Sequence, residues 1–362
     1  MRKARSRTVL ASLAVAAAAV LGLPAVAMAA TAPAATGAAA GAASGPVTER
    51  ATFKVATTPA AVTALPTPPL CKHSPAKRAN RTAFCILGTF VLKFVQISTG
   101  DVVGEGKLEY ANWVFLDARS RTYKDTVEYE LTSLSGAPIL DVLDSESGLR
   151  CSAGCEVAAP NPGPKVVLVK GRVIAHTYTV NSPGSATVNS LNQPLILVVN
   201  ILGPVIIFPI TLGGPITKAR CDSEKFQGNP PPGCVNPDFK PTFKLTASDG
   251  VPDITAHIAR AQRTLKQAWG LKGSGPALHR TTDDALIDRN RRVSCPPNRK
   301  RPTGKNCDEY PFASTEEGAA NNPDFSWAWV NARQNSVAGG KLGSFYAKNR
   351  VIDKDAFWVA VS

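Results

Sequence analysis

The amino-acid sequence predicts an α+β protein, in which an N-terminal all-β, sandwich-like domain precedes a small α+β domain. Between about residues 71 and 245, runs of apolar and β-branched residues are separated by Gly, Pro, Asn and Ser, which is typical of antiparallel strands. After residue 250, apolar residues recur at helical spacing instead. We therefore predict a β-rich accessory domain over residues 69–247 and a second domain over residues 248–362.

The N-terminus has the pattern of an export signal. Four basic residues precede an apolar, Ala-rich run over residues 9–26, and Ala27-Met28-Ala29 offers a small-x-small cleavage site. We expect residues 1–29 to be removed, a secreted, extracellular protein, and no stable membrane span after cleavage. Residues 30–68 are rich in Ala, Thr, Pro and Gly, and this composition predicts a flexible linker.

The chain is strongly basic, with a formal net charge of +14. Removal of the four basic residues of the signal leaves about +10. A charge of this size favours DNA, cell-wall polyanions or anionic membranes as partners. Charge alone does not choose among them.

All eight cysteines follow the predicted cleavage site. An even number in an exported chain indicates four disulfides, and proximity along the chain suggests the pairs 71–85, 151–155, 221–234 and 295–307. A zinc site is the weaker interpretation, because the sequence has no Cys-x-x-Cys and only four scattered histidines.

The β-rich domain is expected to contain strands at residues 84–95, 107–116, 122–131, 172–180 and 195–210. Aromatic and β-branched residues partly alternate with polar ones in these runs, as they do in half-buried strands. The last run is the most apolar, but Asn, Gly and Pro interrupt it, so buried strands are a better interpretation than a membrane helix. The sequence does not indicate what this domain does.

Two helices are expected in the C-terminal domain. The first runs from Asp253, as its cap, to about Trp269, and Gly270 ends it. Its apolar residues form one stripe, which must pack against a core. The second follows Thr281 and Asp284, whose spacing matches a capping box, and continues to about residue 292.

The adjacent acids Asp308 and Glu309 follow a loop that contains four cations. Side chains of adjacent residues point to opposite faces of a strand and lie about 100° apart on a helix. Both acids could bind one ion if the backbone were irregular here. The alternative is an ordinary turn or helix start with acidic residues beside it.

The segment Asn306-Cys307-Asp308-Glu309-Tyr310-Pro311 resembles the Asp-Arg-Asp-Glu-Trp-Pro core of the NucA/NucB family of secreted bacterial deoxyribonucleases. Segments 255–258, 316–318, 334–343 and 355–361 resemble further family segments in the same order. The resemblance covers about residues 253–362. It departs from the family at Ser336 and Lys341, where the family has Arg and Trp.

This resemblance implies a secreted, divalent-metal-dependent, sequence-non-specific endodeoxyribonuclease that hydrolyses the phosphodiester bonds of DNA. Asp308 and Glu309 are then the catalytic and metal-binding carboxylates, and carboxylate and water ligands suit Mg²⁺ or Mn²⁺. His279 is a candidate general base, and Arg280 is a candidate phosphate ligand. A structural role is an equal alternative for His279 and the favoured one for His257.

Six further residues are candidates for substrate binding. Arg299, Lys300, Arg301 and Lys305 lie between Cys295 and Cys307, and Asn335 and Lys341 lie in the segment 334–343. Phosphate contacts by such cations set affinity and salt dependence. The alternative for the loop is a solvated surface. The alternative function is a secreted polyanion- or cell-envelope-binding protein with a degenerate nuclease module.

Overall fold

The structure is a computed structural model, and it describes residues 47–55, 77–96, 98–136, 143–152, 154–200, 210–214 and 216–362. The predicted signal peptide and Cys71 lie outside these ranges. Strands dominate the first part of the described chain, and helices and short strands follow it, which confirms the predicted α+β class. In the described part of the chain, no helix has both the length and the apolar character needed to cross a membrane.

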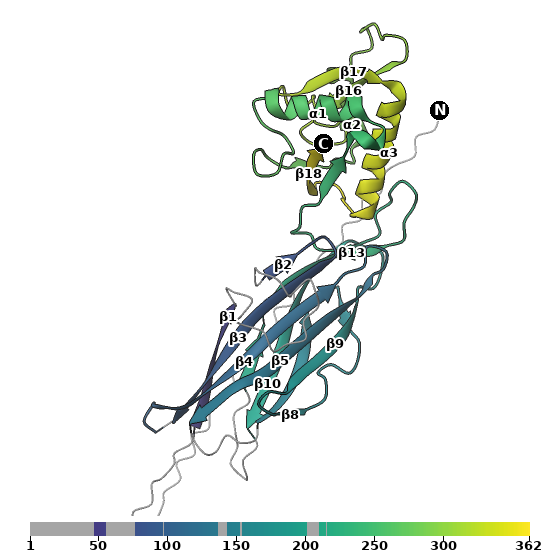
Figure 1. Cartoon of the computed structure of the whole chain (residues 1–362). Coiled ribbons are helices and arrows are strands. Elements are labelled where there is room, and N and C mark those ends of the chain that lie inside the picture. Colours follow the sequence, from purple (N-terminus) through teal and green to yellow (C-terminus); the bar gives the residue numbers. More distant parts are fainter. Residues whose placement is uncertain are drawn as a thin grey trace, which may run out of the picture. The chain divides into compact units, whose positions relative to one another are not determined.

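Seven of the described strands form one antiparallel sheet, in the order β1-β3-β4-β5-β9-β7, with β2 pairing with β3 (Figure 1). Their bounds are β1 Val47–Val55, β2 Lys77–Ala79, β3 Ala83–Gln96, β4 Val102–Phe115, β5 Thr122–Gly136, β7 Glu156–Val157 and β9 Val173–Asn181. The predicted strands at 84–95, 107–116, 122–131 and 172–180 correspond to β3, β4, β5 and β9.

Six described strands form a second antiparallel sheet, in the order β13-β12-β10-β6-β8, with β11 pairing with β10. Their bounds are β6 Leu143–Cys151, β8 Val166–Leu168, β10 Val188–Asn200, β11 Ile210–Gly213, β12 Thr217–Asp222 and β13 Gly233–Val235. The predicted strand at 195–210 falls on β10 and the start of β11, and residues 201–209 lie outside the described ranges.

The two sheets share one hydrophobic core. Phe90 and Tyr129 come from the first sheet, Leu149 and Ile196 come from the second, and all four are buried. Each large apolar side chain buried in this way contributes about 1.5–3 kcal/mol. This shared core makes the two sheets a β-sandwich.

Strand β1 differs from the prediction, because residues 47–55 fall inside the expected flexible linker. All nine of its residues pair with β3, from Val47 opposite Gln96 to Val55 opposite Gly88. From Ala51 to Val55, apolar residues alternate with Thr52 and Lys54, a two-residue period that the window's bulk composition hides. Pairing also occupies the edge of β3, whose backbone groups would otherwise lack partners.

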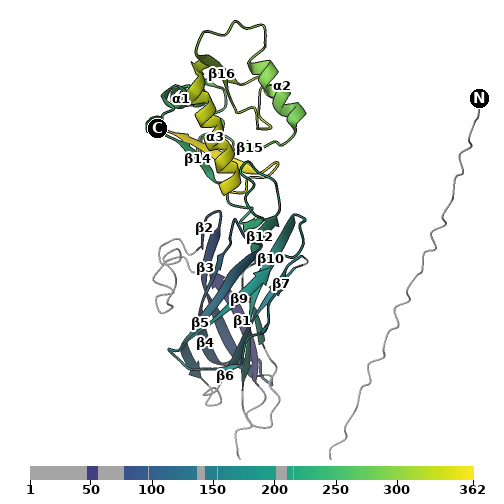
Figure 2. The same ribbon diagram turned by 90° about the vertical axis from the view of Figure 1, so that its right-hand side faces the viewer.

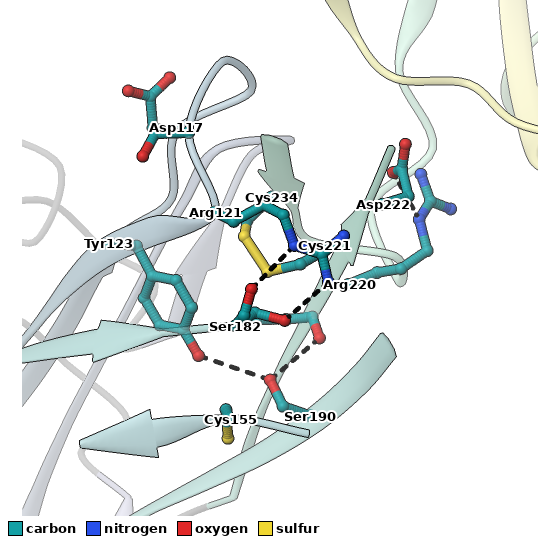
Figure 3. The surroundings of a disulfide bond; sticks show 12 residues. Asp117, Arg121, Tyr123, Cys155, Ser182, Ser190, Arg220, Cys221, Asp222 and Cys234 are labelled. Carbon is teal, nitrogen blue, oxygen red and sulfur yellow. Dashed lines mark hydrogen bonds and ion pairs between the residues drawn. A yellow bond between two sulfur atoms is a disulfide. The ribbon is translucent and has the colours of Figure 1, made fainter. Parts of the chain in front are cut away.

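Three of the predicted disulfides are present, Cys151–Cys155, Cys221–Cys234 and Cys295–Cys307. Cys85 is also disulfide-bonded, and its predicted partner lies outside the described residues. Cys221 and Cys234 are direct cross-strand partners on β12 and β13 (Figure 3).

The C-terminal part of the chain has three α-helices in the described ranges, α1 Pro252–Thr264, α2 Asp284–Ser294 and α3 Ala332–Lys348 (Figure 2). The 3-10 turn η2, Ala247–Asp249, precedes α1. Strands β14 Thr242–Leu245, β18 Ala356–Val361 and β15 Leu278–His279 form a sheet in that order. Strands β16 Lys305–Tyr310 and β17 Ser326–Asn331 form a separate antiparallel pair.

Both predicted helices begin differently from the expectation. Val251 is the cap residue of α1, and Pro252 occupies its first turn, a position where the missing N–H costs nothing. The helix ends at Thr264, and the Asp324 carboxylate then accepts the backbone N–H groups of the next turn. Asp283, rather than Thr281, caps α2 by accepting the N–H of residue 285 at 2.9 Å.

A second hydrophobic core joins the C-terminal elements. Ile254 and Ile258 of α1 pack with Phe357 and Val359 of β18. Strand β14 pairs in parallel with β18 and adds Phe243. This strand ends before residue 248, so the second core draws on residues that precede the predicted domain boundary.

Buried ion pairs connect the loop between α3 and β18 to the β-sandwich. The guanidinium of Arg350 is fully buried and hydrogen-bonded to Asp222, which is also fully buried. Arg220 reaches Asp355 Oδ1 at 2.6 Å, and Arg81 reaches Asp355 Oδ2 at 2.5 Å. Removing one member of such a buried pair typically costs about 3–5 kcal/mol.

Candidate active site

The acids predicted to carry the chemistry lie on a regular strand. Asp308 pairs with Ala328 and Glu309 pairs with Trp327 along the whole of β16 and β17. The irregular backbone considered for this segment is therefore not observed. Asp308 and Tyr310 are buried on one face of the strand pair. Glu309, which lies between them in the sequence, is on the other face and is partly buried.

A cavity of about 750 Å³ nevertheless has both carboxylates in its wall. Helix α3 contributes Asn335 and Leu342 to the lining of the same cavity, and the end of α2 contributes Arg291 and Arg292. The Cys295–Cys307 disulfide also lines the cavity and connects the end of α2 to β16. The cavity therefore combines adjacent acids with cations from a separate element.

His257 holds Asp308 in place. Its Nδ1 lies 2.6 Å from Asp308 Oδ2, and its Nε2 lies 3.0 Å from Ser326 Oγ. The imidazole is 1% exposed, because α1 presents it on the same side as the core residue Ile258. With Asp308 ionised, Nδ1 carries the proton and the Ser326 hydroxyl donates to Nε2. Among the described residues, no donor is hydrogen-bonded to Asp308 Oδ1, so this oxygen is available to a ligand.

The Glu309 carboxyl is electrostatically perturbed. Burial raises its pKa to about 7, and the neighbouring charge of Asp308 adds to the increase. The guanidinium of Arg291 and the backbone N–H of Ala313 oppose it. Burial and the Asp308 charge both disfavour the ionised Glu309 carboxylate, and a bound cation would offset both effects.

The side chains of the cavity supply some of the ligands that a hard divalent cation requires. Asp308 and Glu309 supply carboxylate oxygens, which Mg²⁺ and Mn²⁺ prefer. No group of three or more His, Cys, Asp or Glu is placed to hold a metal within the ranges that the structure describes. An ion bound by two carboxylates would need water and substrate oxygens for its other ligands, and Mg²⁺ sites commonly have this composition.

Residues 271–360 match the family model of the deoxyribonuclease NucA/NucB. We call the C-terminal region that carries this match the NucA/NucB-type domain. This match confirms the resemblance on which the acids were selected. A search among curated proteins found no match for the chain.

His257 lies before the matched residues of the NucA/NucB-type domain, and it is a site residue to which the sequence had given a structural role. Its interaction with Asp308 joins positions 51 residues apart. The resemblance of segment 255–258 to the family could have identified His257 as a site residue. Its place on an apolar helix face favoured a packed histidine instead, and the structure shows that the residue is both packed and bonded to Asp308.

Arg291 and Arg292 are also cavity residues that sequence reasoning missed. They are exposed at the end of α2, and both line the cavity of the NucA/NucB-type domain. The predicted Cys295–Cys307 disulfide was a usable signal, because it ties the end of this helix to the strand that carries Asp308.

The predicted substrate-binding cations lie elsewhere. Of the residues predicted for this role, only Asn335 is among the described residues that line the cavity. Lys305 pairs with Asp253 at 3.1 Å, and Lys341 pairs with Asp249 at 3.0 Å. The others are in the loop closed by the disulfide: Arg299 stacks on Trp327, Arg301 binds Asn306 Oδ1, and Lys300 is exposed.

His279 and Arg280 do not line the cavity either, within the described part of the chain. The Nδ1 of His279 lies 2.6 Å from Glu317 Oε1, and its imidazole is 43% exposed. The guanidinium of Arg280 donates to the Val351 carbonyl and stacks on Tyr346 at 4.8 Å. Burial lowers the pKa of Arg280. The structure therefore gives Arg280 a packing role and places His279 with a different acid.

Proposed function

We propose that the chain is a secreted, divalent-metal-dependent, sequence-non-specific deoxyribonuclease. The observation that carries the proposal is the cavity of the NucA/NucB-type domain, where Asp308 and Glu309 lie in one wall and Arg291 and Arg292 lie at another. Adjacent acids repel each other and a polyanionic substrate unless cations are supplied. The arrangement is therefore suited to a cation and a phosphate together.

Each residue has a role that follows from its position. Asp308 and Glu309 would hold the ion, and His257 would keep Asp308 in the rotamer that leaves Oδ1 available. Arg291 and Arg292 would bind the phosphates that flank the scissile bond, because guanidinium groups match phosphate oxygens in pairs.

A bound Mg²⁺ or Mn²⁺ would supply positive charge against the phosphate as negative charge develops on it. In this proposal Arg291 and Arg292 would contact backbone phosphates rather than base edges, and contacts of that kind carry no sequence information. Sequence-non-specific cleavage is the expected consequence.

Secretion is supported by the basic and apolar N-terminal sequence and by the disulfides. Disulfides persist in oxidising compartments outside the cytosol. Export would place the nuclease where extracellular DNA and cell-wall polyanions are available to it.

The test is nicking of supercoiled plasmid by the full chain with Mg²⁺ or Mn²⁺. We expect nicking that is abolished by chelator, restored by excess metal, and absent from the Asp308→Asn variant. Plasmid that stays supercoiled with every metal, although the protein binds it, would contradict the proposal. That outcome would favour a polyanion-binding protein with a degenerate nuclease module.

A further inference from the structure

One face of the β16–β17 pair has an aromatic surface that the proposed chemistry does not use. Trp327 is the direct cross-strand partner of Glu309, and Trp329 is the partner of Cys307. Partners in an antiparallel pair share a face and lie about 5 Å apart at their Cβ atoms. The two indoles therefore adjoin two residues that line the cavity.

Trp327 is exposed, although large aromatic residues usually lie in the core. Its relative exposure is 36%, and Trp329 contacts its edge at a ring separation of 5.9 Å. The guanidinium of Arg299 lies over the Trp327 ring at 3.5 Å. Arg299 therefore lies over one face of an indole that is still 36% exposed.

The surroundings of Trp327 are cationic. Arg299, Lys300 and Arg301 are in the loop closed by the Cys295–Cys307 disulfide, and the latter two are exposed. Proteins that bind single-stranded nucleic acid combine these two features, an aromatic side chain for base stacking and cations for the adjacent phosphates.

We propose that Trp327 binds an unpaired base of DNA, so that the enzyme engages single-stranded or locally opened DNA in preference to intact duplex. This inference rests on the proposed function. The base takes the place of Arg299 on the indole, and the guanidinium moves to the phosphate of the same nucleotide. An exposed cation–π contact is weaker than stacking of a base on an aromatic ring, so the exchange is favourable.

The preference for unpaired DNA follows from access to the base. In a duplex each base is stacked between neighbours and its faces are covered, so stacking on a protein side chain requires the base to leave the helix. Duplex DNA would still bind through phosphate contacts, which do not depend on Trp327.

Trp358 provides a matched control. It also has a cation near its ring, with Lys240 Nζ 5.5 Å from the ring centre. It lies on β18, the middle strand of the other sheet of this domain, and its strand partner is Thr242. Thr242 is not among the described residues that line the cavity, whereas Glu309, the partner of Trp327, is. A general effect of removing an indole would be seen at both positions.

The experiment measures binding of a labelled oligothymidylate and of a mixed-sequence duplex to the full chain, in chelator so that nothing is cut. We expect Trp327→Leu to weaken oligothymidylate binding about tenfold, the size of one lost stacking contact, and duplex binding less than about twofold. Trp327→Phe should retain most of the affinity, and Trp358→Leu should bind both DNAs like the wild type.

Equal losses on the two DNAs, or no loss on either, would overturn the inference. If Trp327→Leu does not fold, the decision comes from tryptophan fluorescence. Oligothymidylate should quench the wild type and should quench the Trp327→Phe variant much less. Quenching that is unchanged in Trp327→Phe would also reject the idea.

Plasmid nicking separates this inference from the proposed function. A wild-type protein that nicks plasmid, while Trp327→Leu binds oligothymidylate normally, would reject only the stacking role. A wild-type protein that does not nick would reject the nuclease itself.

Discussion

The β-sandwich and the C-terminal domain each contain a buried aspartate held by a polar side chain at the same distance. In the sandwich, the Asn112 side-chain amide donates to Asp125 Oδ1 at 2.6 Å. In the C-terminal domain, His257 Nδ1 lies 2.6 Å from Asp308 Oδ2. Asp125 is 0% exposed, whereas Asp308 lies in the wall of a cavity.

Perturbed pKa values are often used to find functional acids, although a raised pKa does not by itself mark a site. Burial raises the pKa of Asp125 to about 7, but a side chain enclosed between strands cannot reach a substrate. Asp308 has access to the cavity and a second acid, Glu309, beside it. Access to the cavity and a neighbouring charge therefore distinguish Asp308 as a site residue. Burial alone shows only that ionising the carboxyl is unfavourable.

The largest expected difference concerns activity. Asp308→Asn should reduce plasmid nicking about a thousandfold, because it removes a charge from the proposed cation site, and each tenfold loss corresponds to about 1.4 kcal/mol of barrier. Asp125→Asn should leave the nicking rate of the folded protein within about twofold. Equal activity of the two folded variants would remove Asp308 from the mechanism.

The second prediction concerns the pH dependence of stability. The pKa of Asp125 is about 7 in the folded protein, against an ordinary aspartate value of 3.8 that applies to the unfolded chain. The contribution of this carboxyl to the free energy of unfolding is therefore fully present below about pH 4. It declines as the pH rises and is lost above about pH 7. Between about pH 5 and pH 7 the free energy of unfolding should fall by about 2–3 kcal/mol from this group.

Urea denaturation of wild type and Asp125→Asn across this pH range measures that decline. The variant has no carboxyl at this position. The difference in the free energy of unfolding between the two proteins should therefore change with pH by about 2–3 kcal/mol. A difference that is constant with pH would show that Asp125 is ionised when folded.

The third prediction compares the two histidine–carboxylate pairs. His257→Ala should lower kcat for nicking about tenfold to a hundredfold, because loss of an orienting partner typically has that effect on a metal-binding carboxylate. His279→Ala should change it less than about threefold, because its partner Glu317 is outside the cavity lining.

His257→Gln distinguishes positioning from packing. The glutamine amide can donate to Asp308, and it should restore part of the lost kcat without restoring core packing around the ring. Titrating each variant with metal provides a second readout. The apparent affinity for the metal should be weaker in His257→Ala. A larger loss in the His279 variant would reverse the assignment.

The smallest expected effect concerns phosphate binding. Replacing Arg291 and Arg292 with Ala should lower the log–log salt slope for duplex binding by up to about 1.8, since each phosphate contact contributes about 0.9. Replacing Lys305 and Lys341 with Ala removes the same charge outside the cavity and should lower the slope less. Equal slopes for the two double variants would show that only net charge matters.

Features that depend on neighbouring residues could be predicted from the amino-acid sequence. A strongly apolar run predicted β3, and partly alternating runs predicted β4, β5 and β9. Short separations predicted the Cys151–Cys155, Cys221–Cys234 and Cys295–Cys307 pairs. The order of short motifs predicted the C-terminal region that matches the NucA/NucB family model, and it selected Asp308 and Glu309 as candidates. These features are local, because a period or a short loop restricts the backbone within one element or between adjacent elements.

Contacts between elements that are distant in the sequence became visible only in the folded chain. Folding brought His257 from α1 to Asp308 on β16, and Arg291 from α2 to Glu309, and it paired His279 with Glu317 instead. It also paired β1 with β3, although composition had indicated a linker. The physical reason is that spacing fixes the face on which a side chain lies, whereas packing of distant apolar faces decides what that face contacts.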